Sequence, residues 1–173
     1  MTQDVITAYF EQIATNFKPI SHTPAKHRFA EMDADTIAEE VKDKLDFSDW
    51  CLLLEETTPK VRANEANALN EYRYFRYTVC KSATGLDAAE RKAIFHQAEI
   101  YGKHIFMKIL REYRASRERK DPTKVFPLRD IEPKFEMEKY ADILNEDIIG
   151  IDTAISIKEP FKESDYNDVT LWN

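Results

Sequence analysis

The sequence has little of what several kinds of functional site require. Three glycines among 173 residues are too few for the Gly-rich loops that cradle phosphates in nucleotide-binding proteins. Two cysteines, Cys51 and Cys80, do not make a disulfide framework, which favours a reducing cytosol, although they can pair if their strands are neighbours. No apolar run approaches the ~18 residues of a membrane span, and the first residues lack the pattern of a signal peptide. We therefore expect a cytoplasmic protein.

The motifs of common enzymes and metal sites are also missing. The chain has no Gly-x-Ser-x-Gly and no His-Glu-x-x-His sequence. The four histidines are His22, His27, His96 and His104. His96 shares a predicted helix face with Glu99 and Lys103, but zinc needs three or four converging ligands, which favours a solvated face. Glu55 and Glu56 end a predicted strand and are also expected to be solvated. The sequence predicts no catalytic residue, no metal site, no cofactor and no enzymatic activity.

What the chain does contain is enough apolar residues for one core. The apolar fraction is 43% and the aromatic fraction 12%, which predicts a single α+β domain over residues 1–173. The net charge of −7 disfavours a general affinity for nucleic-acid phosphates or anionic membranes. We therefore expect the protein to bind neither a membrane nor a specific nucleic acid.

Hydrophobic periodicity predicts helices and strands in mixed order. Helices are expected at residues 5–17, 35–45 and 87–117, and strands at residues 26–32, 50–55, 71–80, 131–137 and 149–157. This order favours a mostly antiparallel sheet of about five strands, packed against a long helix and two shorter helices. The long helix carries two apolar ridges, one beginning at Ile94 and one at Phe95, which suit it to lie across a sheet.

Two polar segments lie outside this pattern. Residues 57–70 are long for a hairpin loop, so we expect a mobile contact element that becomes ordered against a partner. Residues 159–173 are expected to form a tail that is flexible or contacts a partner.

Charge is segregated along the second half of the chain. Residues 103–129 hold nine basic and three acidic residues, whereas residues 130–173 hold four basic and twelve acidic residues. One interpretation is that the basic block complements the C-terminal end of a helix. The other is that it meets the acidic region of a neighbouring copy in a head-to-tail ring.

The order of elements and two short motifs carry a family resemblance. Residues 49–56 read Asp-Trp-Cys-Leu-Leu-Leu-Glu-Glu before an Asn-containing insertion, and residues 155–161 read Ile-Ser-Ile-Lys-Glu-Pro-Phe before a terminal Trp172. Over nearly the whole chain, this pattern resembles the tail-terminator and tail-completion proteins of phages and prophages. The resemblance implies ring formation, contacts with other tail proteins, and residence in the cytoplasm until assembly into a virion or tail-like particle.

The expected interface combines the basic helix end, the polar insertion and the apolar end of the tail. Its residues are Arg111, Arg114, Arg117, Arg119, Lys60, Arg62, Asn64, Asn67, Leu171 and Trp172. Trp172 is either an anchor in a partner or folded back on its own sheet. Two other hypotheses stay open: a cytosolic interaction or binding module of unrelated role, and an enzyme with a dispersed site.

Overall fold

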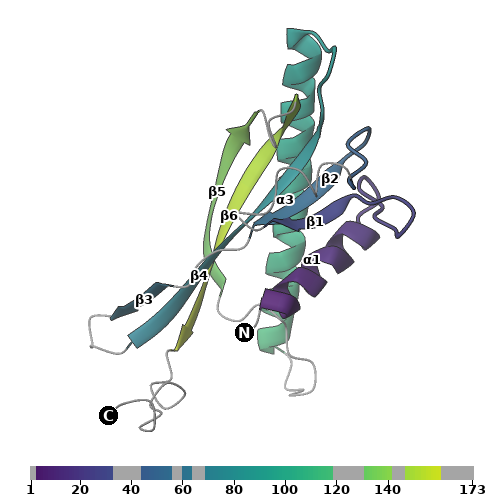
Figure 1. Ribbon diagram of the computed structural model, residues 1–173. Coiled ribbons are helices and arrows are strands. Elements are labelled where there is room, and N and C mark those ends of the chain that lie inside the picture. The colour runs from purple at the N-terminus through teal and green to yellow at the C-terminus, as the bar shows by residue number, and fades with distance from the viewer. Residues whose placement is uncertain are drawn as a thin grey trace, which may run out of the picture.

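The structure, a computed structural model, contains two helices and six strands in the part of the chain that it describes (Figure 1). The described residues are 3–32, 44–55, 60–63, 69–118, 131–141 and 147–160. Side chains are described at residues 3–32, 44–55, 74–116, 136–141 and 147–156. The expected α+β class is confirmed. The helix predicted at residues 35–45 falls largely on residues 33–43, which lie outside the described residues.

All six strands belong to one mixed sheet. They are β1 (Phe29–Met32), β2 (Cys51–Glu55), β3 (Lys60–Ala63), β4 (Leu69–Ser82), β5 (Ile131–Tyr140) and β6 (Ile148–Pro160). Five strands follow the order β1-β2-β4-β6-β5, and β3 pairs with the beginning of β4. The β1–β2 pairing is parallel and every other pairing is antiparallel. The prediction of about five strands therefore lacked one strand, β3.

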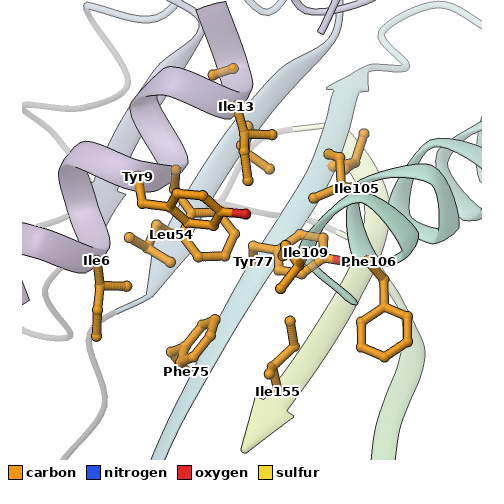
Figure 2. Packing of buried hydrophobic residues seen from close by; sticks show 14 of the residues in the cluster. Ile6, Tyr9, Ile13, Leu54, Phe75, Tyr77, Ile105, Phe106, Ile109 and Ile155 are labelled. Carbon is orange, nitrogen blue, oxygen red and sulfur yellow. The ribbon is translucent and has the colours of Figure 1, made fainter. Parts of the chain in front are cut away.

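Both described helices pack on the same face of the sheet. Helix α1 (Gln3–Asn16) and helix α3 (Ala88–Glu118) contribute to one buried cluster with alternate residues of the strands. Figure 2 shows this packing, with Ile13 and Ile105 reaching over Tyr77 from the two helices. We call this the helix-covered face. The two predicted ridges of α3 are confirmed, since Ile105 and Ile109 of one ridge and Phe106 and Leu110 of the other are buried. In α1, by contrast, Val5 is 43% exposed.

Helix α3 begins with a capping box formed by Asp87 and Glu90. The Asp87 carboxylate accepts hydrogen bonds from the backbone N–H groups of Ala89 and Glu90, and the Glu90 carboxylate accepts one from the Asp87 N–H. Three N–H groups at the start of the helix are thereby satisfied. The cap fixes where the helix begins, and the helix then runs for 31 residues along the sheet.

One segment expected to be a mobile loop contains a strand. Residues Lys60–Ala63 pair with Leu69–Tyr72, so part of the polar insertion is a β-hairpin rather than an unstructured loop. The same part of β4 pairs on its other side with the end of β6. Figure 1 shows that these three strand segments extend away from both helices. We call them the β arm: β3, residues 69–73 of β4 and residues 157–160 of β6. Glu159 and Pro160, the first residues of the expected tail, end β6, and residues 161–173 lie outside the described residues.

Strand β5, which contains Pro133, forms an edge of the sheet. It pairs only with β6 in the described part of the chain, and the register shifts between Ile131 and Phe135, around Pro133. A central strand uses its backbone N–H groups to pair with the strands on both sides. Proline has no N–H to donate, so it is tolerated only at an edge or a bulge. Regular pairing from Phe135 to Tyr140 then fixes which side chains of β5 share a face with those of β6.

Candidate interaction surfaces

The outer side of α3 carries several exposed basic side chains. Six side chains between residues 96 and 114 are exposed, and none of them is acidic. We call them the α3 basic stripe: His96, Lys103, His104, Met107, Arg111 and Arg114. They recur at helical spacing on the side opposite the apolar ridges. Because the ridges hold α3 against the sheet, the stripe is presented on a rigid support.

Two glutamates border this stripe, and each has a lysine partner one turn away. Lys103 donates to Glu99, and Lys108 donates to Glu112. The Glu99 pKa is lowered, first by the Lys103 hydrogen bond and then by the Lys103 charge. Such i,i+4 pairs are typical of a solvated helix face. The arrangement of His96, Glu99 and Lys103 therefore agrees with the solvated face expected from the sequence.

The structure separates the predicted interface residues into different regions. Arg111 and Arg114 are exposed on α3, Arg117 lies in the last turns of the same helix, and Lys60 and Arg62 lie in β3. The helix and the β arm are therefore not a single patch, because β3 pairs at the end of β4 that extends away from α3 (Figure 1). The remaining predicted residues lie outside the described residues: Arg119, Asn64, Asn67, Leu171 and Trp172.

The opposite face of the sheet changes from apolar to charged along the strands. Three rungs cross β2, β4, β6 and β5 in register. The first is Cys51, Cys80, Gly150 and Tyr140; the second is Leu53, Thr78, Asp152 and Glu138; the third is Glu55, Arg76, Ala154 and Glu136. Neither described helix lies on this side, which we call the open face.

The charged end of the open face is acidic and partly exposed. Among the side chains that the structure describes at this end, four carboxylates accompany a single guanidinium, that of Arg76. We call these carboxylates the open-face acidic patch: Glu55, Glu136, Glu138 and Asp152. Glu136 and Glu138 are exposed, Glu55 is half-buried, and only Asp152 is buried. The patch is therefore accessible mainly through the outward strand β5 and the end of β2.

Asp152 is the buried member of this patch. Its Oδ2 lies 3.2 Å from Nη1 of Arg76, and its Oδ1 accepts a hydrogen bond of 3.3 Å from the Thr78 hydroxyl. Burial is the largest influence and raises the Asp152 pKa, while Arg76 and Thr78 lower it. The charges of Glu55 and Glu138 raise it further. The one arginine of the patch is thus engaged by Asp152, and the surrounding glutamates add like charge.

The two cysteines are adjacent, which the sequence left open. Cys51 and Cys80 stand directly opposite each other in the β2–β4 pairing, and both are free thiols with no exposed surface. They pack with Leu53 and Ile148 at the apolar end of the open face. Burial raises the pKa of Cys51 to about 12 and that of Cys80 well above its usual range. This environment is typical of packed structural thiols rather than reactive ones.

The buried Arg28 connects the segment before β1 to the segment before β2. Arg28 precedes β1, and its guanidinium donates to the Ile20 carbonyl at 2.9 Å and pairs with Asp46 and Asp49 at 3.3 and 3.0 Å. Its backbone N–H donates to Nδ1 of His22. These bonds tie residues from before β1 to the turn before β2, where parallel pairing brings the two segments together. We interpret this network as structural.

Comparisons add no family to this description. The sequence finds no match among protein-family models or among curated proteins. In the described part of the chain, no three His, Cys, Asp or Glu side chains converge as metal ligands. Neither described helix combines the length and apolar character needed to cross a bilayer.

Sequence analysis identified the basic helix but not the acidic patch. Arg111 and Arg114 follow a clear helical pattern, so their exposure was predictable. The open-face acidic patch joins residues from β2, β5 and β6 that are up to about a hundred positions apart. Only the strand order and register place them together. The one available signal was the alternation of apolar residues 131, 133, 135 and 137 with Glu132, Lys134 and Glu136, which predicted a half-exposed strand.

Proposed function

We propose that this chain is a structural assembly protein of a phage or prophage-like tail, of the tail-terminator or tail-completion type. It acts by ring formation and by contact with other tail proteins, and it resides in the cytoplasm until it joins a virion or tail-like particle. Its work is binding rather than catalysis. The proposal begins from the family resemblance in the sequence and is supported by the distribution of surfaces in the fold.

The β arm is the observation that most favours an assembly role. Strands β4 and β6 have 14 and 13 residues, although strands of globular proteins usually have about five or six. Their regular pairing continues from Ser82 and Ile148 to Asn70 and Pro160, past the part of the sheet that the helices cover (Figure 1). A paired extension of this kind reaches toward a neighbouring subunit without loosening the core.

Rigid presentation of charge is the second support. Helix α3 is anchored by its buried ridges, so Arg111 and Arg114 are displayed at fixed positions. Charges displayed in this way steer encounter and fix register between subunits more than they add raw affinity. That property suits a protein whose copies must join in one orientation.

The test is the assembly state of the purified chain. We expect sedimentation velocity to show one discrete oligomer at high protein concentration, and electron microscopy to show closed rings. Trp172→Ala should shift the sedimentation toward monomer if the tail anchors a neighbour. A wild-type chain that remains monomeric at every concentration, with and without tail tubes, would contradict the proposed function.

A further inference from the structure

We propose that the α3 basic stripe of one copy docks on the open-face acidic patch of a second copy. This inference rests on the proposed function and specifies the contact by which its rings are built. The stripe and the patch lie on opposite sides of the same sheet, because α3 packs on the helix-covered face and the patch is on the open face. One molecule therefore cannot bring its own two surfaces together.

The charges of the two surfaces are complementary. Lys103, Arg111 and Arg114 give the stripe its positive charge, although Lys103 also pairs with the bordering Glu99. The patch presents the carboxylates of Glu55, Glu136 and Glu138, while its fourth carboxylate, Asp152, is buried and pairs with Arg76. A nucleic acid would also attract the stripe, but it would not account for the acidic surface on the other side of the same molecule. A second copy accounts for both.

Each surface also carries an exposed apolar side chain. The described part of the chain exposes three large hydrophobic residues, and two of them belong to this contact: Met107, 41% exposed, in the stripe, and Tyr140, 51% exposed, on the open face. Tyr140 lies in the rung next to that of Glu138, on the same face of β5. Charge complementarity supplies orientation, and these side chains supply apolar area of the kind found at interface centres.

Such a contact is heterologous, since different surfaces of the two copies meet. Repeating it generates a ring if the rotation between neighbours closes, and an open helical filament if it does not. The β arm extends away from both helices (Figure 1), so it can contact the neighbour after the helix has docked. The order of events is therefore encounter through charge, followed by contacts of the arm.

Charge exchange between two variants tests this contact. Arg111→Glu with Arg114→Glu reverses the stripe, and Glu136→Lys with Glu138→Lys reverses the exposed strand of the patch. Each double variant alone should sediment as a monomer because like charges then face each other. An equimolar mixture of the two should assemble again, because every junction then joins opposite charges. The mixture should sediment at least several-fold faster than either variant alone.

Matched controls separate charge at the contact from total charge. Lys18→Glu with Lys26→Glu changes the net charge as much as reversal of the stripe. These two exposed lysines follow α1 and belong to neither the stripe nor the patch. Asp4→Lys with Glu11→Lys is the corresponding control for the patch, on the exposed side of α1. Both controls should assemble as the wild type does. Circular dichroism should show that all four variants are folded.

The outcomes separate this inference from the proposed function. If the wild type assembles and reversal of the stripe leaves assembly unchanged, the docking inference is wrong while the proposed function stands. If the wild type never assembles, both fail. If the stripe variant loses binding to duplex DNA and the wild type does not self-associate, the stripe is a nucleic-acid surface and the inference is overturned. Filaments in place of rings would uphold the contact and contradict ring formation.

Discussion

The two faces of the sheet differ in what covers them, and the difference separates a buried core from a charged and partly exposed surface. On the helix-covered face, Phe10, Tyr77 and Ile105 are buried among side chains of α1, α3 and the strands. On the open face, the same strands pass from buried thiols to a charged and exposed end. Successive side chains of a strand point to opposite faces of the sheet, so neighbouring residues of one strand have different surroundings.

Tyr77 and Thr78 illustrate this contrast within a single strand. The Tyr77 hydroxyl donates to the Gly102 carbonyl of α3 at 2.9 Å, inside the helix-covered core. The Thr78 hydroxyl donates to Asp152 on the open face. The first bond satisfies a hydroxyl that joins the helix to the sheet, and the second supports a charged surface. Four predictions can break or sharpen this comparison, beginning with the largest expected effect.

Placing a charge in the helix-covered core should be the most damaging change. Ile105→Asp buries an unpaired carboxylate where α3 meets the sheet, and we expect a loss of unfolding free energy on the order of 3 kcal/mol or more. Ala93→Asp, at an exposed position of the same helix, should change it by less than about 0.5 kcal/mol. Urea unfolding followed by circular dichroism measures both. Equal effects would show that the helix-covered face is not the core.

Adding one methyl group should cost more between the strands than under the helix. A Cβ on Gly150 would overlap the Val79 carbonyl oxygen, a backbone atom that cannot move alone. At Gly102 the nearest atom would be Met137 Cε at 2.7 Å, the end of a flexible side chain. We expect Gly150→Ala to cost about 1–3 kcal/mol and Gly102→Ala to cost less, since alanine also favours the helix. Thermal melting of the two variants tests this ranking, and a reversed order would contradict the close approach of β4 and β6 at Gly150.

The buried carboxyl of the open face should make stability depend on pH. Because burial raises the Asp152 pKa above its ordinary value of 3.8, protonation favours the folded state at this residue. Its contribution is therefore complete below pH 3.8 and is lost as the pH rises through the folded-state pKa. Asp152→Asn removes this loss, so its stability relative to the wild type should increase from about pH 4 to about pH 7. A constant difference across that range in urea titrations would contradict the raised pKa.

The two thiols should not react with thiol reagents while the protein is folded. Cys51 and Cys80 are fully buried, and a pKa of about 12 leaves Cys51 almost entirely protonated near neutral pH. Absorbance with a thiol-reactive disulfide reagent should show almost no reaction in the native state and two reactive thiols in denaturant. Rapid labelling of the native protein would mean that the apolar end of the open face is accessible. This prediction concerns reactivity alone, with no change in stability.

Regular alternation explains which parts of the fold the sequence could predict. The apolar ridges of α3 and the strand expected at residues 149–157 each depend on nearby residues, and the structure confirms them. Strand β3 was missed because residues 60–63 contain two basic residues and little apolar pattern. It forms through backbone pairing with β4, which local composition does not reveal.

The two candidate surfaces also differ in whether local sequence pattern could predict them. The basic stripe follows from helical spacing within one segment, so it was accessible to sequence analysis. The acidic patch depends on a register that brings Glu55 of β2 into one rung with Glu136 of β5. Strand order is set by packing of the whole chain, and one sequence gives no direct measure of it. Function is harder to predict from sequence than strand order, because protein interfaces have no fixed sequence motif of the kind that marks a metal site or a catalytic nucleophile.

The most direct measurement of the central claim is cross-linking between isotopically distinct copies. Assembled wild-type protein, mixed from unlabelled and nitrogen-15-labelled chains, is treated with a carbodiimide that joins a lysine amine to a neighbouring carboxylate. Mass spectrometry should find Lys103 of one copy joined to Glu136 or Glu138 of a differently labelled copy. Links confined to single copies, or links between copies that join other segments only, would contradict docking of the α3 basic stripe on the open-face acidic patch.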